Sequence, residues 1–355
     1  MHRMLCGSTW VATLVLASGC GGERTTSGGA WSTKSTGASA RAVEGGSNLG
    51  VIAVSGQNLE DAAIGLLERA AESDSPLLRA NAIEGLHPMP QLAESYARAG
   101  LVNDNRGVRF VAAMTIGRLQ LRDSARLVEP LLHDPSDSVR AAAIYALRRC
   151  GQRVDLNPLA GFLASRDPEV RANAALVLGE LGEPSAAPML EQSLGRGSEM
   201  LSPAQVRVVE LQIAEALLKL GRTEPIHAVR AALFYPPEFS ESTALACLVL
   251  GRVNDRGSVA SLQRLIEADG AERRPAEVRL AAAMALASMG QLVPDSVVTP
   301  YISHGIGAIR SQAAHVLGAI RTEGALASLQ RLMNDADPMV QVSAAASVIR
   351  MTRGG

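Results

Sequence analysis

Arginine is the residue whose spacing along this chain most directly suggests chemistry, because six arginines recur at similar intervals. A row of guanidinium groups could bind a polyanion, since each group offers N–H donors to phosphate or carboxylate oxygens. Nearby aspartates, at Asp137, Asp167 and Asp337, would neutralise such a row. We therefore expect a structural ladder of arginine–aspartate pairs rather than an anion track. The six arginines are Arg79, Arg109, Arg140, Arg171, Arg279 and Arg310.

The ladder is interrupted in the middle of the chain. Glu210 and Thr243 stand at the equivalent positions, and Arg207, one turn before Glu210, is a candidate substitute. Gln341 takes the last position. With these residues included, the nine positions are spaced 30, 31, 31, 39, 33, 36, 31 and 31 residues apart. Such periods are typical of stacked helical repeats.

Each repeat is expected to contain two helices, as residues 167–195 illustrate. Asp167 and Pro168 provide a helix start, and an apolar stripe at 3.6-residue spacing follows. Gly179 and Gly182 are expected to loosen and end this helix before a second apolar stretch begins.

The whole repeat region is predicted to be all-α, an α–α superhelix of about nine helix pairs over residues 58–355. Because such units bury their apolar faces only against their neighbours, we expect an extended, curved array. The helix from Leu59 to Glu72 is expected to cap the exposed face of the first repeat.

The motif D-P-x-V-R-x-x-A-A-x-x-L-G, at residues 167–179, and the run EPSAAPMLEQSL after it resemble the short HEAT-like repeats first named from phycobilisome lyases. That family includes scaffolds, adaptors and a few enzymes. The resemblance implies a non-catalytic scaffold or adaptor for a protein partner; the alternative is an enzyme or enzyme accessory of the HEAT-like lyase group. Deoxyhypusine hydroxylase, another enzyme with similar repeats, binds iron through His-Glu dipeptides, and this sequence contains none.

The N-terminal residues carry a second signal. His2 and Arg3 form a basic start, Met4 to Leu16 is mostly apolar, and the run LASGC ends at Cys20. This resembles the signal peptide of bacterial lipoproteins, which implies a signal peptide at residues 1–19 and lipid on Cys20. The implied location is the periplasmic or extracellular face of the cell envelope, with the outer membrane favoured because Gly21, and not Asp, follows the cysteine.

Residues 20–57 are expected to be a flexible tether to the membrane. Between Gly21 and Gly50, seventeen of thirty residues are Gly, Ser or Thr, a composition that cannot bury enough apolar surface to fold.

Composition argues against several other functions. The chain has 34 Lys plus Arg and 35 Asp plus Glu, interspersed along every repeat, so no basic face for nucleic acid is expected. Cys150 and Cys247 lie three repeats apart and are expected to be free, buried thiols. No histidine pair or C-x-x-C motif suggests a metal site, and no motif suggests a cofactor or catalytic residues.

A candidate partner-binding site lies in the middle of the chain, where three connections between repeats are long: residues 195–203, 234–241 and 269–275. The second connection contains Phe234, Tyr235 and Phe239, stiffened by Pro236 and Pro237. We expect Tyr235 to be more exposed than its neighbours, since an aromatic beside two prolines has little helix to pack against. The alternative is that Phe234 and Phe239 only cover the seam between repeats. The predicted partner-binding residues are Tyr235, Phe239, Phe234 and Pro237.

Overall fold

The computed structural model describes residues 56–195 and 201–354, and every regular element in these two ranges is helical. This confirms the predicted all-α fold. The predicted signal peptide, Cys20 and all but the last two residues of the predicted tether lie outside the described residues. No helix within the described ranges is both long enough and apolar enough to span a membrane.

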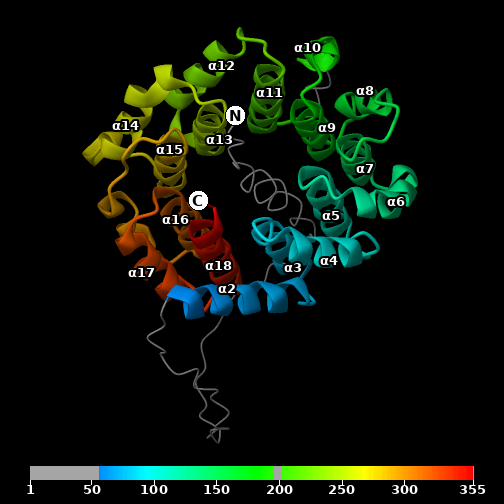
Figure 1. Cartoon of the computed structure of the whole chain (residues 1–355). Helices are drawn as coiled ribbons and strands as arrows, with labels where there is room; N and C mark the ends of the chain where they lie inside the picture. The colour runs from blue at the N-terminus through cyan, green and yellow to red at the C-terminus, as the bar shows by residue number, and fades with distance from the viewer. Residues whose placement is uncertain (1–55, 196–200, 355) are drawn as a thin grey trace, which may run out of the picture.

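The helices form two concentric layers (Figure 1). The helices that contain the nine ladder positions form the inner layer, and the other helices form the outer layer. The inner helices are α3 (Pro76–Gly85), α5 (Arg106–Arg118), α7 (Asp137–Arg149), α9 (Pro168–Leu181), α11 (Pro203–Lys219), α13 (Ser240–Arg252), α15 (Ala276–Ser288), α16 (Gly307–Ile320) and α18 (Pro338–Arg353). The outer helices are α2 (Gly56–Ala71), α4 (Pro90–Gly100), α6 (Ala125–Val128), α8 (Pro158–Leu163), α10 (Ala187–Ser193), α12 (Ile226–Ala231), α14 (Val259–Glu267) and α17 (Glu323–Leu332).

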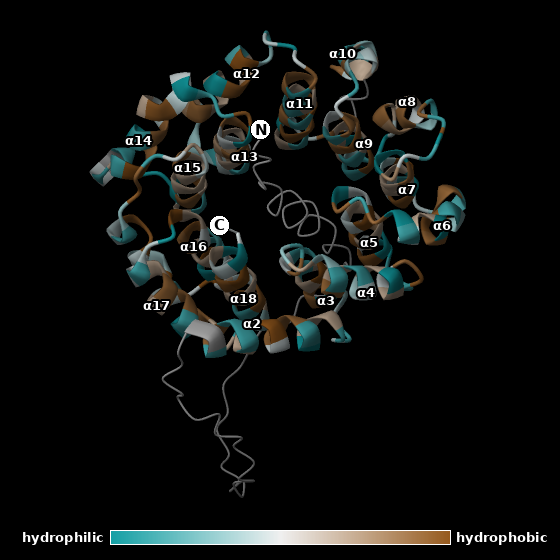
Figure 2. Ribbon diagram, in the orientation of Figure 1, coloured by the Kyte–Doolittle hydropathy of each residue, from teal (hydrophilic) through white to brown (hydrophobic). Residues whose placement is uncertain are grey.

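Short 3₁₀ turns complete the outer layer. Between α15 and α16 they take the place of an outer helix, at η9 (Asp295–Val297) and η10 (Thr299–Tyr301). Figure 2 shows apolar residues concentrated on the inner helices, whereas the outer helices mix apolar and polar residues. This distribution fits a core that lies between the layers and between consecutive inner helices.

The two ends of the array meet, which corrects the prediction of an extended array (Figure 1). Helix α18 packs against both α2 and α3. Leu67 of α2, Gly85 of α3 and Ala346 of α18 meet at this junction: a Cβ atom on Gly85 would lie 2.9 Å from the Cβ of Ala346. Arg353 also donates a 2.5 Å hydrogen bond to Glu60. Helix α2 is therefore not a cap over a free end but the element that closes a ring.

Helix starts follow the predicted signals in several repeats. The side chain of Asp167 accepts a 2.8 Å hydrogen bond from the N–H of Glu169, and Asp337 accepts one of 2.9 Å from Met339. Ser202 and Gln205 form a capping box at the start of α11. These caps satisfy N–H groups that have no partner inside the helix.

Glycines on the inner helices allow unusually close packing. A Cβ atom on Gly117, Gly179 or Gly251 would lie 2.8 Å from the Cα of an alanine on the next inner helix, which leaves no room for a side chain. On Gly318 it would lie 2.7 Å from the Cβ of Ser347. Gly179 therefore lies inside α9 and makes a close contact with α11 rather than loosening its helix, whereas Gly182, with φ of 68°, ends the helix as predicted.

Candidate partner-binding site

The ladder residues hold the loop before their own helix. Arg79, Arg109 and Arg310 each donate to the backbone carbonyl six residues earlier, at 2.9, 2.8 and 2.7 Å. Arg140 and Gln341 make the same contact, at 3.2 and 2.6 Å. This shared contact with the backbone, and not a shared ligand, explains why a long donor side chain recurs at this position.

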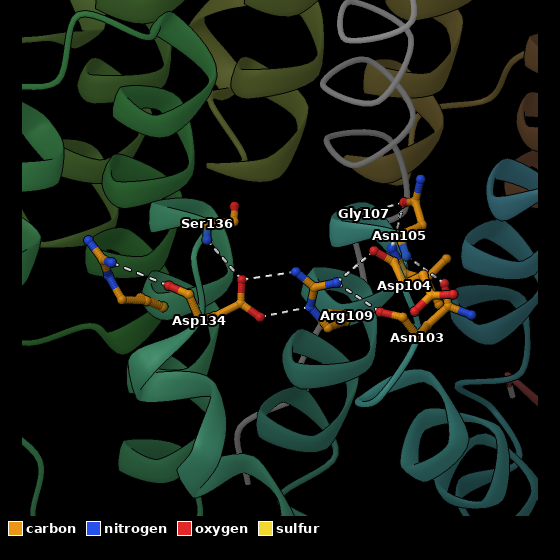
Figure 3. A network of polar contacts seen from close by, with 9 residues as sticks. Asn103, Asp104, Asn105, Gly107, Arg109, Asp134 and Ser136 are labelled. Atoms are coloured by element: carbon orange, nitrogen blue, oxygen red, sulfur yellow. Dashed lines mark hydrogen bonds and ion pairs between the residues drawn. The ribbon is translucent and has the colours of Figure 1, made fainter.

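The aspartates that pair with the ladder differ from those expected. Arg109 forms a bidentate pair with Asp134 at 2.7 and 3.0 Å (Figure 3), and Arg310 forms one with Asp335 at 2.7 Å for both contacts. Each of these aspartates lies 25 residues after its arginine, in the loop of the next repeat. The hydrogen bond from Arg310 holds the pKa of Asp335 below its usual value.

Of the three aspartates predicted as partners, Asp137 pairs with Arg140 in its own helix. Asp167 and Asp337 are N-caps instead, because their side chains are already engaged by backbone N–H groups. The position of the true partners could have been found from the sequence, since an aspartate 25 residues after the arginine recurs.

Among the described residues, three ladder arginines form no ion pair with a carboxylate: Arg79, Arg171 and Arg279. Arg171, only 3% exposed, donates to the carbonyl of Ser193 at 3.4 Å, and Arg279 donates to that of Ala268 at 3.2 Å. The Nε atoms of Arg171 and Arg279 are buried without a hydrogen-bond partner. Arg196 and His304 stand 25 residues after Arg171 and Arg279, where Arg109 and Arg310 have aspartate. The carbonyls that Arg171 and Arg279 bind, those of Ser193 and Ala268, lie just before two of the long connections.

The connection after α12 is a folded segment, which we call the aromatic segment, Phe234–Phe239. The segment begins with the last residue of η5 (Ala232–Phe234) and ends with η6 (Pro237–Phe239). The guanidinium of Arg207 lies 3.9 Å from the ring centre of Phe239 and 5.4 Å from that of Tyr235. The two rings meet edge to face with centres 6.3 Å apart. Arg207 therefore does not replace Glu210 in the ladder but joins α11 to the next repeat.

Phe234 is the exposed aromatic residue of the segment. It is 66% exposed, whereas Leu233 is 1% exposed and Tyr235 is half-buried against the core. The expectation that Tyr235 stands out is therefore wrong, because stacking on Arg207 and Phe239 holds its ring inward. Pro237 is exposed and Phe239 is half-buried. The four predicted residues thus divide into two that hold the segment, Tyr235 and Phe239, and two that face solvent.

The backbone around Phe234 is fixed by side chains from other elements. Thr243 donates to the carbonyl of Ala232 at 3.1 Å. Arg274 donates to the carbonyls of Leu233 and Tyr235, at 3.4 and 2.8 Å, on either side of Phe234. Thr243, which interrupts the arginine ladder, and Arg274, in the next long connection, therefore hold the backbone that carries Phe234.

A buried ion network that the sequence analysis missed lies near the C-terminal ends of the inner helices. Glu215 accepts hydrogen bonds from Arg252 at 2.7 and 2.6 Å and pairs with Lys219 at 2.8 Å, and Lys219 also reaches Glu180 at 2.5 Å. Burial alone would raise the pKa of Glu215, but the two cations outweigh it and lower the pKa to about 2. Lys219 and Arg252 each lie nine residues after a ladder position, as Arg118 and Arg350 do. This spacing is visible in the sequence.

The remaining candidate groups are structural. Cys150 and Cys247 are free and buried, as predicted, and burial raises the pKa of Cys247 to about 12. Within the two described ranges, no three His, Cys, Asp or Glu side chains are grouped so that they could hold a metal ion.

A ring of paired helices in two layers, built on a period near 31 residues, defines an α-helical repeat protein. The sequence model of the HEAT repeat family matches residues 63–148, 125–205 and 271–350, which together are more than half of the chain. The chain belongs to the HEAT repeat family.

Solved structures with similar folds are only distantly related in sequence. Human deoxyhypusine hydroxylase in complex with glycerol is 17% identical, with 84% of this chain and 98% of that chain covered and a TM-score of 0.37. The CpcE–CpcF complex of phycocyanin lyase from Nostoc sp. PCC7120 is 21% identical, with coverage of 71% and 93% and a TM-score of 0.30. An archaeal HEAT-like repeat protein from Thermococcus onnurineus NA1 is 13% identical, with coverage of 75% and 97% and a TM-score of 0.27. No curated protein sequence matches the chain.

Proposed function

We propose that this HEAT repeat protein is a non-catalytic scaffold that binds a protein partner through the aromatic segment and is anchored to a bacterial envelope membrane by lipid on Cys20. The observation that carries the binding site is Phe234, a large apolar side chain left 66% exposed while its backbone is clamped on both sides. An aromatic anchor on a fixed backbone loses little conformational entropy on binding, and such residues are common hot spots.

The rest of the segment supports the same proposal. Tyr235, Arg207 and Phe239 stack on one another and hold the segment against α11 without using Phe234. If the segment only covered the seam, Phe234 would be expected to pack against it too. Phe234 instead faces solvent, so packing within the segment does not explain why a large apolar side chain stands there.

Capture of a partner tests the binding site. The full chain and its Phe234→Ser variant would be used as baits in detergent-solubilised membranes of the cells that produce it, and captured proteins would be measured by mass spectrometry. Val102→Ser is the matched control, because Val102 is 85% exposed and lies just after outer helix α4, as Phe234 lies just after outer helix α12 at the end of η5. We expect a protein lost from Phe234→Ser and retained by Val102→Ser; equal capture by both variants contradicts the proposed site.

The anchor is tested separately. The proposal rests on the basic start, the apolar run and the Ser18-Gly19-Cys20 junction. Several acyl chains would bind the membrane far more strongly than the single chain that gives marginal binding. Cys20→Ser should shift the protein from the detergent phase to the aqueous phase on detergent partitioning, and a variant that stays with the membrane contradicts lipid anchoring at Cys20.

A further inference from the structure

The exposed charged groups in and beside the aromatic segment are mainly acidic, whereas the chain as a whole is nearly neutral. Four carboxylates and three guanidinium groups lie in or next to the aromatic segment and in the connection that supplies Arg274. All four carboxylates are exposed, whereas two of the three guanidinium groups are half-buried and already bound, one between aromatic rings and one to backbone carbonyls. The carboxylates are those of Glu238, Glu241, Asp269 and Glu272, and the guanidinium groups are those of Arg207, Arg273 and Arg274.

An approaching surface therefore meets mainly negative charge. The seven groups together carry −1, and the exposed members alone, the four carboxylates and Arg273, carry −3. Phe234 is 66% exposed, and Arg274 binds the carbonyls on both sides of it, which ties the connection that contains Arg274 to the aromatic segment. The site is an exposed apolar side chain on a segment whose exposed charges are mainly acidic.

A projecting side chain needs a cavity in the partner. Removing an aromatic ring from water is favourable by roughly 1.5–3 kcal/mol only if the partner covers it fully. Charges at the border of an interface contribute mainly to the rate of association and to the choice of partner, because like charges placed opposite one another cost free energy. The border of the complementary cavity should therefore be basic.

We infer that the partner receives Phe234 in an apolar pocket bordered by lysine or arginine side chains. This inference rests on the proposed function and specifies the chemistry of the partner's surface. It is tested with the photo-cross-linking variant Phe234→p-benzoylphenylalanine of the full chain, irradiated in the membranes of the producing cells. Leu292→p-benzoylphenylalanine is the matched control, because Leu292 is 99% exposed but lies at the opposite end of the inner helices, after α15.

The position of the cross-link in the partner decides the matter. The expected result is a partner cross-linked from position 234 and not from 292, at an apolar site with at least two lysines or arginines beside it. In the same membranes, the charge reversals Glu238→Lys and Glu272→Lys, combined, should lower the cross-linking yield at low salt by about two- to five-fold. Glu129→Lys with Glu323→Lys, also exposed and in outer elements of other repeats, should leave it unchanged.

The outcomes separate this inference from the proposed function. A cross-link at 234 to a site without basic residues, or a yield that charge reversal leaves unchanged or raises, overturns the inference and leaves the proposed function standing. A protein that cross-links equally from positions 234 and 292, or from neither, overturns the proposed binding site and the inference with it.

Discussion

The two sides of inner helix α13 are held by different means. On one side Gly251 lets α13 approach α15 until a Cβ atom on the glycine would lie 2.8 Å from the Cα of Ala285. On the other side, towards α11, long side chains bridge the two repeats: Arg252 binds Glu215, and Arg207 stacks on the aromatic segment. One seam is set by close backbone contact, and at the other, charged and aromatic side chains add to the apolar packing.

The difference shows where a repeat protein has room for function. A seam formed by glycine and alanine fixes the distance between helices and tolerates little change. A seam bridged by long side chains accommodates an inserted segment, because such side chains can span a variable distance. The aromatic segment, the interrupted ladder and the exposed Phe234 all occur at the second kind of seam.

The largest effect is expected from the ion network of the α11–α13 seam. Arg252 and Glu215 are 9% and 6% exposed at the side chain, so Glu215→Gln leaves Arg252 without its carboxylate and Lys219 with Glu180 alone. Breaking a buried pair in this way typically costs about 3–5 kcal/mol. Chemical denaturation of the variant should show a loss of that order. A loss below about 1 kcal/mol would mean that the network contributes little to this seam.

The same carboxylate predicts an acid-dependent loss of stability. The pKa of Glu215 is lowered from 4.5 to about 2 in the folded chain, so the folded state binds this proton less readily than the unfolded state. Its contribution is therefore present above pH 4.5 and is lost as the pH falls from about 4.5 towards 2. Denaturation midpoints measured between pH 6 and pH 3 should fall more steeply for the natural chain than for Glu215→Gln. Parallel pH profiles would contradict the lowered pKa.

The fold was largely predictable, because the ladder spacing, the helix starts at Asp167 and Asp337, and the buried cysteines follow from local sequence. Closure of the ring was not. Closure depends on the sum, over the whole array, of the small rotations between consecutive repeats. No local sequence motif determines that sum. Only contacts such as Arg353 with Glu60, 293 positions apart, reveal it.

The sequence marked the aromatic segment but not the arrangement of its side chains. Two prolines and three aromatics mark the segment, yet which ring faces solvent depends on Arg207 and Arg274, which come from neighbouring repeats. The sequence places Tyr235 beside the prolines and cannot show that a guanidinium from α11 lies against its ring. Tertiary contacts determine which side chains are exposed, and a local sequence pattern carries no information about those contacts.

A smaller effect is expected at the glycine seam on the other side of α13. Alanine is normally favoured over glycine in a helix by about 1 kcal/mol. At Gly251 its methyl group would meet the backbone of α15, and overpacking of this kind costs about 1–3 kcal/mol. Gly251→Ala should therefore lower the denaturation midpoint, while Gly161→Ala, in α8 with no atom within 4 Å of its Cβ position, should leave it unchanged or raise it. Equal shifts in the two variants would show that close approach does not limit this seam.

The smallest effects distinguish the two roles within the aromatic segment. Tyr235→Ala removes an edge-to-face ring contact and a cation–π contact, which together are worth about 1–2 kcal/mol at a half-buried site. Phe234→Ala removes a ring that is 66% exposed and should change stability by no more than about 0.5 kcal/mol. Thermal melting of both variants, compared with partner capture by each, should show Tyr235→Ala with a lower melting temperature and Phe234→Ala with an unchanged one and lost capture. If Phe234→Ala instead lowers the melting temperature as much as Tyr235→Ala, then Phe234 also serves the α11–α13 seam, and both aromatics belong to the scaffold rather than to the binding site.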